Sequence, residues 1–243
     1  MKILGIIPAR YASTRFPGKP LVDIAGKSMI QRVYEQSKKC HLLTDVIVAT
    51  DDERIYYHVT GFGGKAVMTS TEHQSGTDRC AEVAGKYPEF DIIINIQGDE
   101  PYINPEQISN VALCFDNADT QIATLVKKIQ TEQELFNPNS PKVILNKNSE
   151  AIYFSRSPLP HIRGHEQADW LNHFAYYKHI GIYGYRADVL QQITKLPISS
   201  LEKAESLEQL RWVENGYRIK VAKTELETHA IDTPEDLEKL SEL

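Results

Sequence analysis

The sequence has few cysteines, and their positions do not indicate a metal site or a disulfide framework. Only three occur among 243 residues, and no two of them have the CxxC spacing: Cys40, Cys80 and Cys114. Zinc sites and disulfide-stabilised domains need paired or closely patterned cysteines. We therefore expect these side chains to be small buried apolar groups in a reducing compartment.

Long apolar runs are also missing. No run approaches the ~20 residues that a membrane-spanning helix needs. The first residues, 1–5, lead directly into a strand-like segment and lack the layout of a signal peptide. The sequence thus predicts a cytoplasmic protein without a membrane span.

Positive charge is in deficit, with a formal net charge of −6. Proteins that bind nucleic acid broadly show a basic face or stripe, so we expect no nucleic-acid partner. An anionic ligand would have to be bound by a local group of cations or by a metal ion, because the overall field of the protein is unfavourable.

Three motifs of common enzyme classes do not occur: the Walker A pattern GxxxxGK[ST], the dinucleotide turn GxGxxG and the nucleophile elbow GxSxG. Their absence argues against a P-loop ATPase, a nicotinamide dehydrogenase and a serine hydrolase, respectively.

Short apolar runs and amphipathic segments alternate through the first half of the chain. The predicted strands are Ile3–Pro8, Asp45–Thr50, Lys65–Met68 and Asp91–Ile96. The predicted helices are Ser28–Lys38, Asp52–Thr60, Thr77–Lys86 and Pro105–Phe115. Strands separated by helices indicate right-handed βαβ units and a mainly parallel sheet.

The regular alternation of strands and helices ends after a predicted strand at Thr120–Lys127. A polar, proline-containing region at about 130–180 is predicted to be an insertion, and an aromatic strand leads back to the core. The remaining predicted elements are strands Lys142–Leu145, Ala151–Ser155, Lys178–Tyr185 and Arg218–Lys223, and helices Asp188–Lys195, Lys203–Asn215 and one starting at Pro234. Together they predict one α/β domain over residues 1–243, with a mixed sheet and a small inserted subdomain.

A cationic loop directly follows the first strand. It carries three fixed cations and two hydroxyls around a Pro17-Gly18 turn: Arg10, Arg15, Lys19, Ser13 and Thr14. Three cations so close together repel one another unless an anion lies among them, and guanidinium and ammonium groups match phosphate oxygens well. Ligands of open α/β sheets bind beyond the carboxyl ends of the strands. The loop therefore indicates a triphosphate site, with a solvated basic loop as the alternative.

This loop is the first of several sequence blocks, in a fixed order along nearly the whole chain, that resemble those of one family. That family is the 3-deoxy-manno-octulosonate cytidylyltransferases, the CMP-Kdo synthetases of lipopolysaccharide assembly. The blocks span residues 8–20, 74–79, 95–101, 154–156, 179–186, 207–211 and 231–236.

The resemblance implies a Rossmann-like nucleotidyltransferase of the nucleotide-diphospho-sugar transferase type. It implies transfer of CMP from CTP to 3-deoxy-D-manno-octulosonate (Kdo), with release of pyrophosphate. It also implies a homodimer built through the insertion. The same reaction on 8-amino-3,8-dideoxy-octulosonate or a related sugar acid remains open, as does a non-catalytic nucleotide-binding module.

The resemblance also implies roles for individual residues. CTP would be bound by the loop residues Arg10, Ser13, Thr14, Arg15 and Lys19 together with Ser75, Thr77, Arg79 and Gln97. The sugar acid would be bound by Arg156, His179, Tyr183, Glu208 and Gln209. Mg²⁺ would be held by Asp99 and Asp232, which with Arg10, Arg15 and Lys19 form the catalytic set.

Each of these residues also has an ordinary structural interpretation. Asp99 fits a turn before Pro101, and Asp232 precedes a routine helix start with Thr233 as N-cap. Ser75 or Thr77 fits a plain helix cap. Glu208 and Gln209 fit the exposed face of an amphipathic helix, and His179 fits a buried core histidine.

Overall fold

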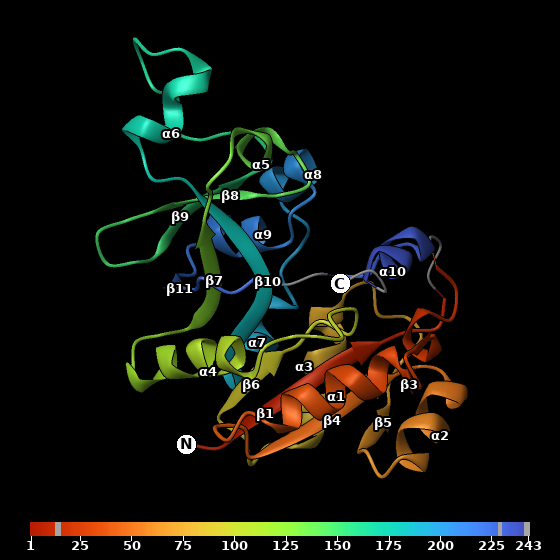
Figure 1. Ribbon diagram of the computed structural model, residues 1–243. Helices are drawn as coiled ribbons and strands as arrows, with labels where there is room; N and C mark the ends of the chain where they lie inside the picture. The colour runs from red at the N-terminus through yellow and green to blue at the C-terminus, as the bar shows by residue number, and fades with distance from the viewer. Residues whose placement is uncertain (13–15, 228–229, 241–243) are drawn as a thin grey trace.

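A computed structural model of the protein describes residues 1–12, 16–227 and 230–240 (Figure 1). Its centre is a nine-stranded sheet whose main path has the order β11-β7-β10-β6-β1-β4-β5. The strands of this sheet are β1 (Ile3–Ala9), β4 (Asp45–Thr50), β5 (Ala66–Met68), β6 (Ile92–Asn95), β7 (Ile122–Lys128), β8 (Lys142–Leu145), β9 (Ala151–Ser155), β10 (Tyr177–Arg186) and β11 (Ile219–Lys223). A separate short hairpin joins β2 (Asp23–Ile24) to β3 (Lys27–Ser28).

The sheet is mixed and mainly parallel, which confirms the predicted fold class. β1 pairs in parallel with both β4 and β6, β4 pairs with β5, and β7 pairs with β11 in the same way. Only β10, between β6 and β7, and the β8–β9 hairpin attached to its edge run antiparallel to their neighbours within the described sheet.

Helices cover both faces of the sheet. They are α1 (Met29–Lys38), α2 (Glu53–Gly61), α3 (Gly76–Lys86), α4 (Pro105–Leu113), α5 (Glu132–Phe136), α6 (Trp170–His173), α7 (Ala187–Ile193), α8 (Ser200–Glu205), α9 (Gln209–Glu214) and α10 (Pro234–Leu240). Short 3₁₀ turns accompany them in the described part of the chain: η1 (Lys19–Leu21), η2 (Cys114–Asp116) and η3 (Gln167–Asp169). Apolar side chains of α1, α2 and α4 pack on one face, and those of α3, α7 and α9 on the other.

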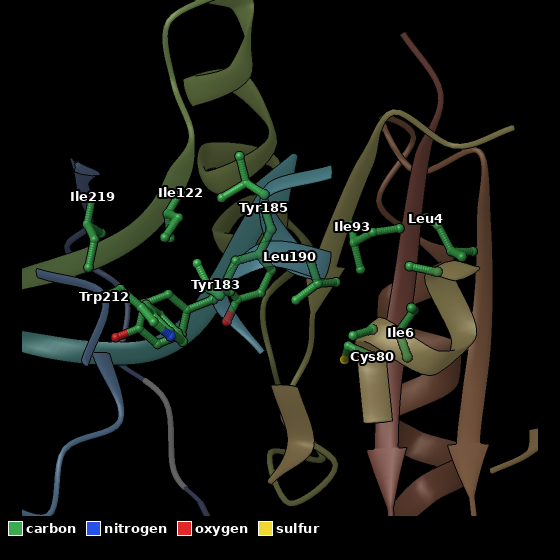
Figure 2. Packing of buried hydrophobic residues seen from close by; sticks show 14 of the residues in the cluster. Leu4, Ile6, Cys80, Ile93, Ile122, Tyr183, Tyr185, Leu190, Trp212 and Ile219 are labelled. Atoms are coloured by element: carbon green, nitrogen blue, oxygen red, sulfur yellow. The ribbon is translucent and has the colours of Figure 1, made fainter. Parts of the chain in front are cut away.

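The apolar first strand shows why the sheet is buried on both sides. Leu4 and Ile6 point into the core shared with α3 and α7, as Figure 2 shows, whereas Ile3 and Ile7 point into the core shared with α1 and α4. Successive side chains of a strand alternate between faces, so a strand covered on both faces must be apolar throughout.

Most helices begin where a capping residue precedes the apolar pattern. Ser28 caps α1 and Asp52 caps α2, each by accepting a backbone N–H in the first turn. Ser75 and Asp78 form a reciprocal capping box at the start of α3. Such caps satisfy amide groups that have no partner inside the helix, which explains why the predicted starts of α1, α2, α3 and α4 agree with the observed ones to within about one residue.

The region between β7 and β10 contains α5, the β8–β9 hairpin, η3 and α6, and it projects from the sheet at the top of Figure 1. A small apolar cluster around Ile129, Leu135, Trp170 and Tyr176 joins α5 to α6, whereas Val143 and Phe154 of the β8–β9 hairpin pack into the main core.

The predicted single helix Lys203–Asn215 is wrong, because the chain forms two helices there. Ser206 has a φ of 51°, in the left-handed region, and it ends α8 before α9 begins. The break turns Glu208 and Gln209 toward the interior: Gln209 is only 6% exposed. The alternative of an exposed helix face for these two residues is therefore also wrong.

Among the described residues, we find no helix that combines the length and the apolar character needed to cross a membrane.

Candidate functional site

A cavity of about 360 Å³ opens where β1 and β6 end and α3 begins. This is the edge of the sheet at which α/β proteins commonly bind ligands. Ten of the residues predicted from the sequence line it: Arg10, Lys19, Ser75, Thr77, Arg79, Gln97, Asp99, Tyr183, Glu208 and Asp232. Residues from six separate blocks of sequence are thus gathered in one place.

The loop after β6 lies very close to the end of β1, and Gly98 allows this approach. A Cβ atom at Gly98 would lie 2.7 Å from the carbonyl oxygen of Pro8, which is shorter than side chains tolerate. Gln97 donates a hydrogen bond of 2.9 Å to the carbonyl oxygen of Gly181 and so links the loop to β10. Asp99 is therefore held against the strand that leads into the cationic loop.

Asp99 and Asp232 lie on either side of one ammonium group. Lys19 Nζ is 2.8 Å from Asp99 Oδ2 and 3.2 Å from Asp232 Oδ1. The Lys19 side chain is only 14% exposed and that of Asp99 25%, whereas that of Asp232 is 40% exposed, so the ion pair with Asp99 is the better shielded of the two.

Local backbone features bring these three side chains together. Gly18, with a φ of 73°, begins the short turn η1 that carries Lys19. The backbone N–H of Ile231 donates a hydrogen bond of 2.9 Å to the carbonyl oxygen of Asp99, which places Asp232 beside it. Ile231 is fully buried against Ile24 and Met29, and this packing anchors the returning chain.

Asp232 and the helix cap do not compete. The Thr233 hydroxyl accepts the backbone N–H of Asp236, and the Asp236 carboxylate accepts the N–H groups of both Asp232 and Thr233. Thr233 thus caps α10 as predicted, while the Asp232 carboxylate faces the cavity.

This pair of carboxylates fits a Mg²⁺ ion. Magnesium is commonly held by one or two protein carboxylates, with waters and substrate phosphates as the other ligands. A cationic nitrogen already lies between one oxygen of Asp99 and one of Asp232. The donor set is therefore suited to a small hard cation, and no cluster of three or more potential metal ligands occurs in the described part of the chain.

The start of α3 forms the wall on the predicted nucleotide side. Ser75 is the N-cap, so its hydroxyl is already used by the helix. Arg79 is 3% exposed and donates to Asp51 Oδ2 at 2.7 Å and to the Thr69 hydroxyl. Its guanidinium borders the cavity but is held by protein partners, so Arg79 stabilises this wall whatever further contact it makes.

The adjoining wall, on the predicted sugar side, contains Tyr183 and Glu208. Thr77 Oγ1 donates a hydrogen bond of 2.7 Å to Glu208 Oε2 and thereby joins the two walls. Burial raises the pKa of Glu208, and hydrogen bonds from Thr77 and Ser75 oppose that shift. Burial, followed by the nearby Glu208 charge, raises the pKa of Tyr183 well above its usual value. Tyr183 is therefore a neutral phenol at physiological pH.

Comparisons with known proteins agree over the full length. A cytidylyltransferase family profile matches residues 4–221. The 3-deoxy-manno-octulosonate cytidylyltransferase of Parabacteroides distasonis is 64% identical over 98% of this chain and 96% of its own. That of Bacteroides thetaiotaomicron is 59% identical over 100% and 98%. The chain belongs to the 3-deoxy-manno-octulosonate cytidylyltransferase family.

A solved structure of a family synthetase, CMP:2-keto-3-deoxy-manno-octonic acid synthetase complexed with CTP, superposes with a TM-score of 0.93. It is 45% identical and is covered over 100% of both chains. A cytidylyltransferase from Leptospira borgpetersenii, 18% identical with a TM-score of 0.64, covers 99% of this chain and 85% of its own and shares the fold.

Three residues that the family resemblance assigns to the sugar acid are absent from the described cavity wall: Arg156, His179 and Gln209. Arg156 donates to the carbonyl oxygens of Pro138, Glu205 and Ser206. It thereby fixes the turn between α8 and α9 that orients Glu208. The sugar-binding roles of these three residues stay predictions.

His179 lies behind the cavity wall rather than in it. Its Nε2 is 3.0 Å from the Thr124 hydroxyl, and its ring contacts Phe154 edge-on and Tyr183. Burial lowers the pKa of His179 to about 4. At neutral pH the ring is uncharged, and the side chain is half-buried beside the cavity wall.

Two cavity residues with polar side chains, Asn95 and His73, were missed by the sequence interpretation. Asn95, 4% exposed, is the last residue of β6 and a polar residue at the end of an apolar run. His73 immediately precedes the predicted nucleotide segment, and its Nε2 lies 2.6 Å from Glu82 Oε2. The available signals were that Asn95 is the first residue of the block 95–101 and that His73 directly precedes the block 74–79. Ser13, Thr14 and Arg15 lie outside the described residues.

Proposed function

We propose that this protein transfers a cytidylyl group from CTP to 3-deoxy-D-manno-octulosonate, giving CMP-Kdo and pyrophosphate for lipopolysaccharide biosynthesis. The observation that carries the proposal is that one cavity joins the cationic loop and the aspartate pair to the Tyr183–Glu208 wall. The relatives that match the chain from end to end carry the name of this activity.

The reaction is an in-line displacement at the α-phosphorus of CTP by the anomeric hydroxyl of the sugar acid. No covalent enzyme intermediate is needed, because positioning and neutralisation of charge supply most of the rate. Arg10 and Lys19 bind the β- and γ-phosphates and stabilise the negative charge that develops on the leaving pyrophosphate. Arg15 is assigned the same role.

Asp99 and Asp232 would hold Mg²⁺. When bound, this ion lowers the pKa of the attacking hydroxyl and neutralises phosphate charge, so that no strong general base is required. The two aspartates would fix the position of the ion in the cavity.

The Tyr183–Glu208 wall orients the sugar acid. The Glu208 carboxyl offers an acceptor for hydroxyl groups, and the Tyr183 side chain, whose hydroxyl oxygen is buried, lines the wall beside it. Thr77 donates a hydrogen bond to Glu208, so the nucleotide side and the sugar side of the cleft are in direct contact.

We also propose a cytoplasmic homodimer assembled through the region 130–180. This region projects from the sheet (Figure 1), and it presents Ile152, 53% exposed, and Phe174, 41% exposed. Large apolar side chains exposed on a projecting segment favour a protein interface. The molar mass in solution, from light scattering, should be twice that of the 27.6 kDa chain.

The activity is tested by pyrophosphate release from CTP and Mg²⁺, with Kdo and with 8-amino-3,8-dideoxy-octulosonate as separate acceptors. We expect release that depends on Kdo and stops when EDTA is added. Preference for the 8-amino sugar would reassign the substrate. Binding of CTP without pyrophosphate release with either acceptor would support the alternative of a nucleotide-binding module and contradict the enzyme.

A further inference from the structure

Among the described residues, Lys19 has two anionic partners, and both are the aspartates that fit a metal ion. Its ammonium nitrogen lies 2.8 Å from Asp99 Oδ2 and 3.2 Å from Asp232 Oδ1. All three side chains line the same cavity. The exposed fractions of the side chains are 14% for Lys19, 25% for Asp99 and 40% for Asp232.

The position of Lys19 reduces the repulsion between the two aspartates. The two carboxylate oxygens cannot lie farther apart than the sum of those two distances, about 6 Å. Two like charges at this separation in a partly enclosed cavity repel each other. The Lys19 ammonium offsets that repulsion, so both aspartates can remain charged and correctly placed without any bound ion.

The same arrangement creates competition. A divalent cation that binds Asp99 and Asp232 takes oxygens that Lys19 now holds, and its double positive charge repels the ammonium. Lys19 must then find other anionic partners. It lies on the short turn η1 at the end of the cationic loop, and a lysine side chain has a flexible four-carbon stem, so triphosphate oxygens are accessible to it.

We propose that Lys19 acts as an internal cation that occupies the aspartate pair in the nucleotide-free protein and moves to the triphosphate when CTP binds. Metal binding is therefore coupled to nucleotide binding: the aspartates are released for the metal only when phosphates attract the ammonium away. This inference rests on the proposed function for the identity of the nucleotide. It adds a property of the nucleotide-free protein, namely that its own Lys19 occupies the metal site.

The coupling is tested with Mn²⁺ as a spectroscopic substitute for Mg²⁺, in the absence of nucleotide. Free Mn²⁺ is measured by electron paramagnetic resonance in titrations of the full-length protein and of Lys19→Met. Removing the competing ammonium should tighten Mn²⁺ binding about tenfold, corresponding to ~1.4 kcal/mol. Equal or weaker Mn²⁺ binding by Lys19→Met would overturn the proposal.

A matched control separates local competition from the change in net charge. Lys27 forms an exposed ion pair of 2.6 Å with Glu35 and has a side chain that is 45% exposed. Lys27→Met removes the same charge, and it should leave Mn²⁺ affinity unchanged. If it tightens Mn²⁺ binding as much as Lys19→Met does, the effect is a general field effect and the proposal fails.

A second arm tests where the ammonium goes. CTP binding is measured by calorimetry in EDTA, so that no metal contributes. Lys19→Met should weaken this metal-free binding at least tenfold, whereas unchanged affinity would show that Lys19 does not move to the phosphates. Lys19→Gln, which keeps a polar side chain, repeats both arms if the methionine variant fails to fold.

The outcome is independent of the activity assay. Absence of Kdo-dependent pyrophosphate release by the unmodified protein would refute the proposed function but would leave the Mn²⁺ comparison intact. Equal Mn²⁺ affinities in an active enzyme would refute only the role of Lys19.

Discussion

The neutral His179 makes the stability of this protein sensitive to mildly acidic pH. Burial lowers the pKa of His179 to about 4 from its ordinary 6.5. Phe154, Tyr183 and Thr124 surround the ring, and the Thr124 hydroxyl is its observed hydrogen-bonding partner. Protonation in the folded state therefore costs free energy that protonation in the unfolded chain does not.

The direction and the size of the change in stability follow from the pKa of His179 in the folded state, about 4, and its ordinary value of 6.5. Above pH 6.5 the ring is neutral in both states, so the full stability is present. As the pH falls from 6.5 toward 4, the unfolded chain binds a proton that the folded protein resists, and stability is lost. For these pKa values the loss is about 2 kcal/mol at pH 5 and about 3 kcal/mol when pH 4 is reached.

Urea denaturation at pH 7.5 and pH 5.0 measures this loss, with His179→Gln as the comparison. The glutamine amide keeps a hydrogen-bonding group near Thr124 but does not titrate. We expect the unmodified protein to lose about 2 kcal/mol more than the variant between the two pH values. His41→Gln, at an exposed position, controls for the substitution itself. Equal losses in the unmodified protein and His179→Gln would refute the burial argument.

Three further predictions concern the cleft. Asp99→Asn should nearly abolish pyrophosphate release while circular dichroism shows an unchanged fold, because it removes the proposed metal-binding charge and the ion pair with Lys19 but leaves the apolar core intact. Near-normal turnover would contradict the site. Gly98→Ala should lower the free energy of unfolding, measured by urea denaturation, by about 1–3 kcal/mol and reduce activity. The reason is that its Cβ would lie 2.7 Å from the carbonyl oxygen of Pro8. Gly85→Ala is the control, because its Cβ would make only an ordinary contact at 3.8 Å. Burial opposes the low pKa of Glu82, but hydrogen bonds from Lys86, Ser70 and His73 lower it to about 2. Glu82→Gln should therefore destabilise the protein at pH 7, and the difference in urea stability should shrink as the pH falls below 4.5; a difference that does not depend on pH would contradict this.

The secondary structure was predictable where the signal is local. The strand Asp45–Thr50 has the predicted bounds, and the start of α4 lies at the predicted Pro105. Apolar alternation, N-caps and proline act over a few residues, so these elements can be recognised without knowledge of the fold.

The break at Ser206 was not predictable in this way. Nothing in the local sequence requires a left-handed serine, and the residues around it are compatible with a continuous helix. Packing decides the conformation: Leu207 and Leu210 are buried against the main core, and Arg156 donates to the carbonyl oxygens of Glu205 and Ser206. The orientation of Glu208 into the cleft depends on this break.

In the site, too, some features could be predicted from local sequence and others depended on the packing of the domain. The cationic loop and the block with Asp99 could be recognised as candidate ligand-binding segments by their composition and by their places after buried strands. The ion pairs between Lys19 and the two aspartates could not be derived from local sequence. Asp99 lies 80 positions and Asp232 213 positions after Lys19 in the chain. Arg79 was predicted to bind the nucleotide, yet its guanidinium is held by Asp51, 28 positions earlier.

The amino-acid sequence by itself determined the α/β architecture, the family and most of the residues that surround the cleft, since these depend on short-range patterns and on ordered sequence blocks. Only the tertiary structure decided which charges neutralise one another and which side chains face the cavity. The reason is that ion pairs and burial depend on which strand ends meet at one edge of the sheet, and that meeting is set by the packing of the whole domain.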